Sequence, residues 1–177
     1  MADSHWAAAY INKMAEQGII NGKTANSFAP NDAITRAEFA AILSRMSGEE
    51  LPAADNTFTD VNANAWYAGN VAWAVKAGIT NGMTASTFAP EAKISRQEMA
   101  VMIMRYVEHK EKTLAENTQP VTFADNAAIA SYAKDAVSAM QKAGIISGKE
   151  NNMFAPAANA TRAEAAKMLG MLLEQLN

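Results

Sequence analysis

The feature that most constrains this chain is a four-residue motif that occurs three times. It reads Thr35-Arg36-Ala37-Glu38, Ser95-Arg96-Gln97-Glu98 and Thr161-Arg162-Ala163-Glu164. In a capping box, a Ser or Thr hydroxyl accepts a hydrogen bond from the backbone N–H three residues later. A Glu at that later position accepts one from the N–H of the cap residue. Each copy therefore predicts the start of a helix, with the cap formed by Thr35 and Glu38, Ser95 and Glu98, or Thr161 and Glu164.

The arginine of the motif has no such local explanation. A guanidinium in the first helical turn opposes the helix macrodipole, which costs about a few tenths of a kcal/mol. Yet Arg36, Arg96 and Arg162 stand at this position in all three copies. Free backbone N–H groups at a helix N-terminus and a forked cation together form a receptor for a carboxylate or phosphate. We therefore predict that these arginines bind an anion, and that removing Arg36 leaves the stability unchanged or slightly raised.

The motif belongs to a longer unit that is repeated three times. Six positions keep the same spacing in every copy: Gly18, Gly22, Phe28, Pro30, Arg36 and Glu38; Gly78, Gly82, Phe88, Pro90, Arg96 and Glu98; Gly144, Gly148, Phe154, Pro156, Arg162 and Glu164. Identical internal spacing predicts the same backbone three times. We place the repeats at residues 1–50, 58–119 and 120–177.

Each repeat is expected to contain two helices joined by a compact loop. The first helix begins near an aromatic residue (Trp6, Trp66 or Tyr132) and ends at a glycine suited to the left-handed conformation (Gly18, Gly78 or Gly144). The second begins at the capping box. We predict that the charged stretch 107–119 extends the second helix of the middle repeat. The lead-in Phe58-Thr59-Asp60-Val61 recurs at Phe123, and its first copy would precede residue 1, so we interpret the chain as an excised piece of a longer protein.

Composition excludes several classes of function. The net charge is −3 and no stretch gathers lysine and arginine into a stripe, which argues against nucleic acid or a membrane surface as the partner. There is no cysteine, and His5 and His109 lie far apart without a second ligand at metal-like spacing. No apolar run approaches the roughly 20 residues that a bilayer span requires. We expect no metal, no cofactor and no transmembrane segment.

The combined motifs resemble the S-layer homology domain, and three such domains would cover essentially the whole chain. The matching features are the Phe-x-Asp lead-in, the aromatic at the head of the first helix, Gly-Ile-x-x-Gly, Phe-x-Pro and Thr-Arg-Ala-Glu. The resemblance implies an all-α fold of three helix-loop-helix repeats, packed with pseudo-threefold symmetry around a shared helical core, with grooves between adjacent units. It also implies an extracellular module that holds a fused passenger protein non-covalently on a Gram-positive cell wall.

The ligand that this resemblance implies is a secondary cell-wall polymer, a peptidoglycan-linked glycan whose terminal N-acetylmannosamine commonly carries a pyruvate ketal. Transferred to this sequence, the arginines of the motif would face the acid group, aromatic side chains would face the sugar, and backbone groups at three loop glycines would add hydrogen bonds. These residues are Arg36, Arg96 and Arg162; Trp6, Trp66 and Tyr132; Gly22, Gly82 and Gly148. Because Tyr132 replaces Trp in the third repeat, we expect the third pocket to differ most.

Two other readings stay open from the residues alone. A helical-repeat scaffold that binds another protein would also have this pattern, with its arginines solvated or paired to acidic neighbours. An enzyme is disfavoured, because a glycosidase needs two carboxylates in unlike environments and the recurring carboxylates are explained by capping. The chain also lacks a nucleophile motif and a phosphate-binding glycine loop.

Overall fold

The computed structural model describes residues 5–24, 26–54 and 58–176. Over these residues the fold is all-α, as the sequence predicts. The six α-helices are α1 (Ala8–Glu16), α2 (Arg36–Ser47), α3 (Ala68–Lys76), α4 (Arg96–His109), α5 (Lys134–Lys142) and α6 (Arg162–Leu176). Three short 3-10 helices lie at Asn126–Ala128, Ser131–Ala133 and Glu150–Asn152. Within the same ranges, no helix has the length and apolar character to cross a membrane.

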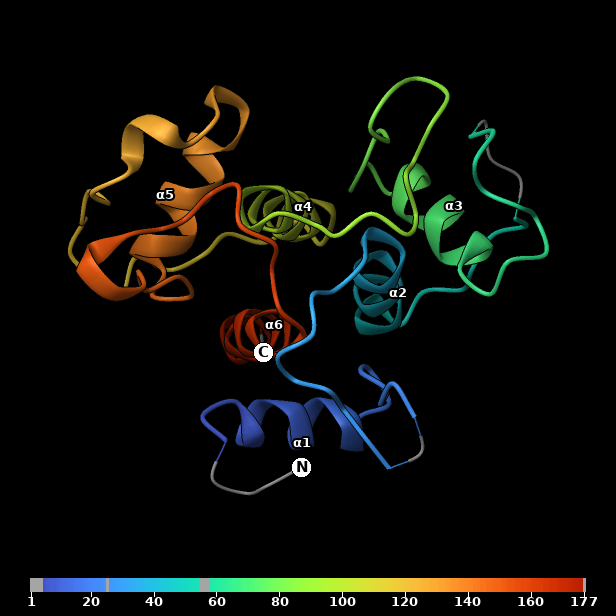
Figure 1. The fold of residues 1–177 in the computed structure, drawn as a ribbon, viewed down its shortest axis with the longest axis horizontal. Helices are drawn as coiled ribbons and strands as arrows, with labels where there is room; N and C mark the ends of the chain where they lie inside the picture. Colours follow the sequence, from blue (N-terminus) through green and yellow to red (C-terminus); the bar gives the residue numbers. More distant parts are fainter. Residues whose placement is uncertain (1–4, 25, 55–57, 177) are drawn as a thin grey trace.

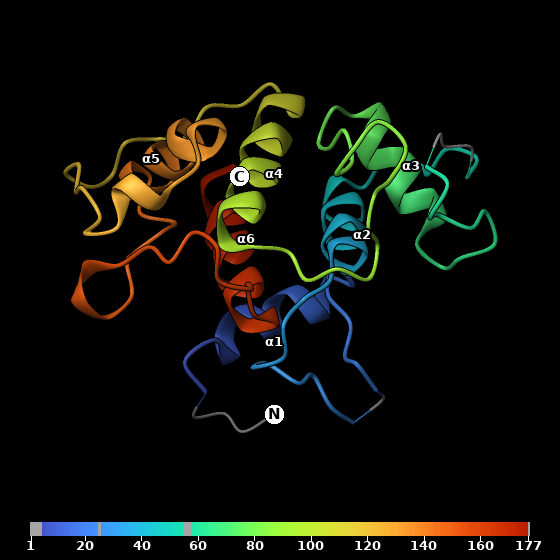
Figure 2. The same ribbon diagram turned by 45° about the horizontal axis from the view of Figure 1, so that its top comes forward.

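The second helices of the three repeats form the centre of the molecule, and the first helices pack outside them. Figure 1 shows α2, α4 and α6 nearly end-on around the middle, with α3 beside α2, α5 beside α4 and α1 beside α6. The view turned by 45° shows the same three pairs (Figure 2). Each first helix therefore packs against the second helix of the preceding repeat, and α1 closes the ring by packing against α6 at the other end of the chain.

Three backbone hydrogen bonds give the centre its approximate threefold symmetry. The N–H of Ile34 donates to the carbonyl of Ala160 at 3.0 Å, that of Ile94 to Ile34 at 3.1 Å, and that of Ala160 to Ile94 at 2.9 Å. All three side chains are fully buried. The residues before the three capping boxes thus form a closed cycle, which confirms the predicted pseudo-threefold arrangement around a shared core.

The outer helices end as their glycines predict. The residues that follow them have φ values of 68°, 72° and 75° (Gly18, Gly78 and Gly144). At the first of these ends, Gly18 donates to the carbonyl of Ala15 at 3.0 Å and Ile19 donates to that of Met14 at 2.9 Å. This is the Schellman pair of hydrogen bonds, and Ile19 is buried beside it.

The lead-in motif clamps the loop between the two helices. The Asp60 carboxylate accepts hydrogen bonds from the N–H groups of Phe88 at 2.9 Å and Ala89 at 2.7 Å. Ala89 needs this support because its φ is 57°, in the left-handed region. Burial alone would raise the pKa of Asp60, but the two backbone donors hold it below its usual value. Asp125 clamps the third repeat in the same way.

The predicted extension of the helix after the middle repeat is wrong. Helix α4 ends at His109, and Glu111 has a φ of 52°. Further along, the N–H groups of Asn117 and Thr118 donate to the carbonyl of Lys142 at 2.8 and 2.9 Å. These contacts with the end of α5 require the chain to cross to the next repeat, and they outweigh the local preference of the charged residues for a helix.

An exposed carboxylate, that of Glu49, joins the first two repeats through three side-chain donors and should make the stability depend on pH. Glu49 accepts hydrogen bonds from Trp73 Nε1 at 3.0 Å, His109 Nε2 at 2.9 Å and Lys110 Nζ at 3.2 Å. The Trp73 hydrogen bond is the largest of the effects that lower the pKa of Glu49 to about 2.

We therefore expect the stabilisation by Glu49 to be complete above its unfolded pKa of about 4.5 and to be lost as the pH falls toward 2. Urea unfolding midpoints at pH 6 and pH 3 should differ more in the wild type than in Glu49→Gln. An equal difference in the two proteins would contradict this assignment.

Candidate functional site

All three predicted capping boxes are present. At the first, Thr35 Oγ1 accepts from the N–H of Glu38 at 3.1 Å, and Glu38 Oε2 accepts from the N–H of Thr35 at 2.8 Å. The same reciprocal pair joins Ser95 to Glu98 and Thr161 to Glu164. The motif therefore starts α2, α4 and α6 as its residues indicate.

The helix N-termini are not free to receive an anion, so that part of the sequence prediction is wrong. The N–H of Arg36 donates to the carbonyl of Ala92 at 2.9 Å, and the N–H of Ala37 donates to that of Pro90 at 3.0 Å. The third N–H of the helix is used by the cap. In the other two helices the first two donors bind the neighbouring repeat in the same way, at Ala158 and Pro156, and at Asp32 and Pro30.

The arginines of the motif connect each repeat to the next one around the ring. Arg96 is 3% exposed, its Nε donates to the carbonyl of Phe154 at 2.7 Å, and its guanidinium lies 5.1 Å from the centre of the Phe154 ring. Its Nη1 pairs with Glu164 at 2.6 Å. Arg36 contacts Phe88 and Glu98 in this way, and Arg162 contacts Phe28 and Glu38.

These contacts explain why an arginine stands at an unfavourable helical position. Burial lowers the pKa of Arg36, Arg96 and Arg162, and in each case the partner glutamate opposes that shift. A charge that is nearly excluded from water persists only where a carboxylate and hydrogen-bond acceptors surround it. The helix dipole is therefore outweighed by contacts with the next repeat, and the sequence prediction that Arg36 contributes nothing to stability does not fit this geometry.

Three equivalent grooves open around the ring, and each is built from all three repeats. One repeat supplies a loop glycine, the motif glutamate and a cation on its second helix; the following repeat supplies the aromatic; the preceding repeat supplies the motif arginine. The first groove contains Gly22, Glu38, Arg45, Trp66 and Arg162. The second contains Gly82, Glu98, Arg105, Tyr132 and Arg36, and the third contains Gly148, Glu164, Lys167, Trp6 and Arg96.

The predicted site residues are thus brought together, but in groups that the sequence does not show. The sequence prediction placed grooves between adjacent units, whereas each groove takes residues from three. Tyr132 belongs to the third repeat and yet lines the second groove, so its replacement of Trp changes that groove instead of the third.

The aromatic residues are the most exposed large side chains of the grooves. Trp6, Trp66 and Tyr132 are 57%, 62% and 60% exposed. An exposed Trp or Tyr side chain leaves much apolar surface in water, and three at equivalent positions indicate a binding surface. Because they make little contact with the core, they can be replaced without disturbing the fold.

Two of the three loop glycines, Gly22 and Gly82, leave no room for a side chain, whereas a Cβ on Gly148 would meet its nearest neighbour at 3.2 Å. Gly82 has a φ of 83°, and a Cβ at this residue would lie 2.5 Å from Cε1 of Phe58. A Cβ on Gly22 would lie 2.6 Å from the carbonyl oxygen of Thr24. In the first groove the neighbouring carbonyl of Asn21 already accepts from Arg162 Nη2 at 2.6 Å. Loop packing therefore explains Gly22 and Gly82 before any ligand is considered.

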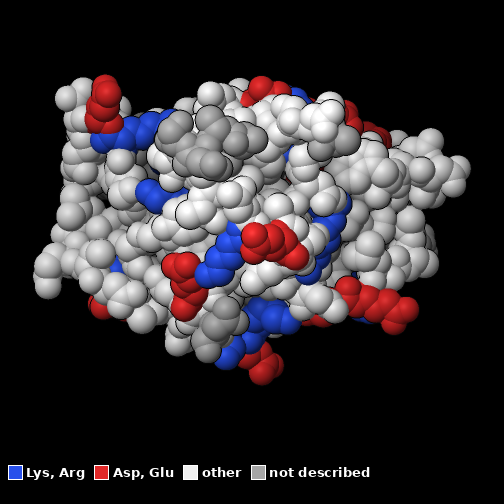
Figure 3. All heavy atoms as spheres, turned by 90° about the horizontal axis from the view of Figure 1, so that it is seen from below, with Lys and Arg blue, Asp and Glu red and all other residues white. Residues whose placement is uncertain are grey.

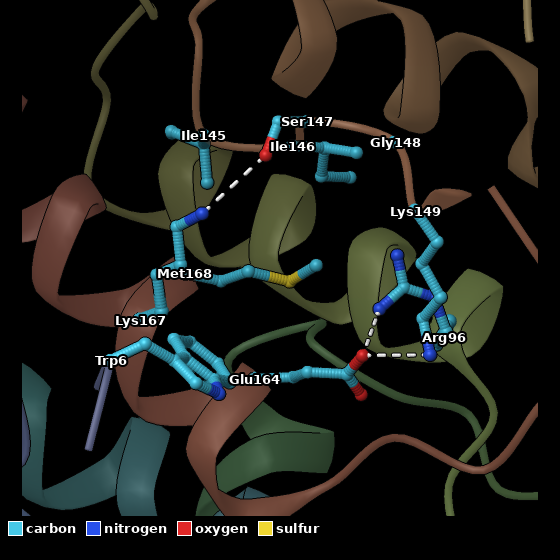
Figure 4. A pocket seen from close by; sticks show the side chains of 10 residues that line it. All are labelled: Trp6, Arg96, Ile145, Ile146, Ser147, Gly148, Lys149, Glu164, Lys167 and Met168. Atoms are coloured by element: carbon cyan, nitrogen blue, oxygen red, sulfur yellow. Dashed lines mark hydrogen bonds and ion pairs between the residues drawn. The ribbon is translucent and has the colours of Figure 1, made fainter. Parts of the chain in front are cut away.

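The third groove shows how the charges are arranged (Figure 4). Glu164 Oε1 lies 2.6 Å from Arg96 Nη1 and 3.0 Å from Lys149 Nζ. Burial alone would raise the pKa of Glu164, but the N–H of Thr161 and these two cations lower it. Lys167 points to the opposite wall, where its Nζ donates to Ser147 Oγ at 3.4 Å.

The grooves differ in size and in several wall residues. Their cavity volumes are ≈ 260, ≈ 420 and ≈ 220 Å³ for the first, second and third groove. The largest has Met83 where the other two have Lys23 and Lys149. The sequence prediction missed these residues, and it also missed Arg45, Arg105 and Lys167. The recurrence of Arg45 as Arg105 at the same place in the repeat was the available signal.

The surface outside the grooves carries charges of both signs. On the face seen from below, lysine and arginine alternate with aspartate and glutamate, and no basic band crosses it (Figure 3). Among the described residues, no three His, Cys, Asp or Glu side chains gather as metal ligands would.

Comparison with known proteins agrees with the repeat pattern. The family model of the S-layer homology domain matches residues 2–40, 57–100 and 122–166. The chain is 37% identical over 97% of its length to an amylopullulanase of Thermoanaerobacterium thermosulfurigenes, and 36% identical over 98% to exoglucanase XynX of Acetivibrio thermocellus. It is 31% identical over 98% of its length to the surface-layer 125 kDa protein of Lysinibacillus sphaericus.

These relatives are much longer than the similarity. The chain spans 9%, 16% and 14% of the three proteins, so the similarity covers their S-layer homology part alone. An amylopullulanase, an exoglucanase and a surface-layer protein thus share one module, which covers only a small part of each. The chain belongs to the S-layer homology family, as three repeats of its domain that act outside the cell in anchoring to the bacterial cell wall.

Proposed function

We propose that this chain anchors a passenger protein by binding the acidic terminal sugar of a secondary cell-wall polymer, with a pyruvate ketal as the acid group, in its three grooves. The module binds without catalysing a reaction. The observation that carries the proposal is the threefold recurrence of one combination: an exposed aromatic side chain, cations and loop backbone around a cavity of a few hundred Å³.

Each component suits an acidic sugar. An aromatic ring at the groove rim packs on the apolar face of a pyranose, and the cations attract its acid group. The recurring carboxylates do not suit hydrolysis, because Glu38, Glu98 and Glu164 are held in capping boxes and in ion pairs with the motif arginines. Three grooves on one molecule also allow several polymer ends to be bound at once, which raises the overall affinity through effective concentration.

The exposed aromatics give the most direct test. We expect the triple substitution of Trp6, Trp66 and Tyr132 by alanine to abolish co-sedimentation with isolated cell walls, because each groove loses its sugar-facing surface. The melting temperature should stay close to that of the wild type, since all three side chains are more than half exposed. Leu51→Ala is the matched control, because Leu51 is 45% exposed and lines none of the three grooves.

Two further measurements separate this proposal from a protein-binding scaffold and from an enzyme. Extraction of the polymer from the walls should remove binding by the wild type, whereas a protein-binding scaffold would sediment as before. No soluble sugar should appear during incubation. A folded triple variant that still sediments at the wild-type level would contradict the proposal.

A further inference from the structure

A second set of cations lines the grooves, and it differs from the motif arginines in having no carboxylate partner among the residues that the structure describes. Each motif arginine forms an ion pair with a motif glutamate of the next repeat. Arg36 Nη1 lies 3.1 Å from Glu98, Arg96 Nη1 lies 2.6 Å from Glu164, and Arg162 Nη1 lies 3.5 Å from Glu38. Each groove contains one motif arginine and one motif glutamate, so these charges largely cancel there.

Arg45 and Arg105 occupy the same position on α2 and α4, nine residues after the motif arginine. They line the first and second grooves, and both are half-buried. In the part of the chain that the structure describes, neither guanidinium has a carboxylate within 4.0 Å. Arg105 Nη1 donates to the carbonyl of Ile79 at 3.4 Å. Burial lowers the pKa of Arg45, and no carboxylate opposes this shift.

In the third groove, the cation that has no carboxylate partner among the described residues comes from another position on the second helix. Met171 stands on α6 where the other repeats have Arg45 and Arg105. Lys167, one helical turn earlier, places its ammonium in this groove, and its partner there is the neutral Ser147 hydroxyl (Figure 4). The remaining groove lysines each contact a carboxylate: Lys23 contacts Asp32, and Lys149 shares Glu164 with Arg96.

We infer that Arg45, Arg105 and Lys167, and not the motif arginines, are the cations that bind the acid group of the ligand. The inference rests on the proposed function and assigns the acid-binding residues within it. An anion that approaches a motif arginine also approaches its glutamate, which repels it, whereas the second cation attracts without opposition. The motif arginines are positioning residues, because each holds the glutamate and the loop of its groove in place.

The inference also makes the grooves unequal. A guanidinium can donate two parallel hydrogen bonds to one carboxylate, whereas an ammonium acts as a point charge. The first and second grooves should therefore select a carboxylate strongly, and the third should discriminate less between an acid and a neutral ester.

Tryptophan indole signals allow each groove to be followed separately. Trp66 lies in the first groove and Trp6 in the third, while Trp73 is buried elsewhere with its indole N–H on Glu49. We would titrate the whole chain with the methyl glycoside of N-acetylmannosamine that carries a pyruvate ketal, and with the methyl ester of that acid. Two-dimensional NMR of the three indole N–H groups then reports two grooves and one internal reference.

The decisive variant is Arg45→Met, because the third repeat folds with methionine at the same position. We expect this substitution to weaken the affinity of the first groove for the acid, measured at Trp66, by about ten- to a hundredfold. This is the usual effect of losing a charge-assisted hydrogen-bonded pair. The Trp6 titration should not change. In Arg45→Met, the first groove should also bind the acid and the ester with equal affinity. In Arg45→Lys, it should keep part of its preference for the acid over the ester. Lys112→Met removes an exposed charge outside the grooves and serves as the control.

The outcomes separate the two ideas. If the wild type binds neither probe, the proposed function fails in its sugar-specific form, and the inference fails with it. If the wild type binds the acid and Arg45→Met binds it equally well, or still prefers the acid to the ester at Trp66, the inference alone is overturned. A weaker acid titration at Trp66 together with equal binding of acid and ester there supports it.

Discussion

Replacing Arg96 with alanine is expected to lower the free energy of unfolding by about 3 kcal/mol, as the loss of one partner from a buried ion pair usually does. Arg96 is 3% exposed, and its removal leaves Glu164 and the carbonyl of Phe154 without their guanidinium donor. It also removes the packing of the guanidinium on the Phe154 ring. Urea unfolding followed by circular dichroism measures the effect.

Lys149→Ala is the matched control for this measurement. Lys149 pairs with the same oxygen of Glu164, but its side chain is 44% exposed, so its loss should cost about 0–1 kcal/mol. Similar unfolding midpoints for the two variants would show that the Arg96 pair is not structural. The sequence alone led to the opposite expectation for these arginines, because it shows the unfavourable helix dipole but not the neighbouring repeat.

Replacing Gly170 with methionine is the second substitution for which we expect a large effect. Gly170 lies on α6 where α1 closes the ring, and a Cβ there would meet Cδ1 of Tyr10 at 2.6 Å. Overpacking at such a site costs about 1–3 kcal/mol. The middle repeat has Met104 at the same position, so methionine as such is compatible with this helix.

The matched rescue is the double variant Gly170→Met with Tyr10→Ala. It recreates the pair Met104 and Ala136, which occupies the equivalent positions where α4 and α5 pack. We expect the double variant to be more stable than Gly170→Met alone, with a coupling energy within the range of about 0.5–3 kcal/mol that neighbouring residues show. A double variant that is no more stable than the single one would contradict direct contact between these positions.

The three helix pairs therefore share one geometry but not one set of side chains. Where α2 meets α3, the equivalent positions are Ser44 and Asn70, which are buried and joined by a hydrogen bond of 2.7 Å. The ring-closing pair instead combines glycine with tyrosine. Because a large residue faces a small one at one interface and two polar residues meet at another, a helix placed in the wrong interface would clash or leave a polar group unpaired.

The sequence by itself determined the local structure of this protein. A capping box needs only four consecutive residues, and a Schellman end needs only a glycine after an amphipathic helix. The conformations of Thr35, Glu38 and Gly18 can therefore be predicted from their neighbours in sequence alone. The threefold repetition at constant spacing also predicted the same backbone three times, while the pseudo-threefold packing of the repeats was implied by the resemblance to the S-layer homology domain. The resemblance implied that Trp6, Trp66 and Tyr132 line grooves, and each of them lines one of the three cavities.

Only the tertiary structure decided how these parts combine, because the decisive contacts join residues that are far apart in the chain. Arg36 and Glu98 are paired across two repeats, the first two N–H groups of α2 are bound by the loop before α4, and Trp6 shares a groove with Gly148. No local pattern reports that a helix packs on the preceding repeat or that α1 meets α6. For the same reason the sequence offered the motif arginines as the anion site, whereas three-dimensional pairing neutralises them and leaves Arg45, Arg105 and Lys167 as the uncommitted cations.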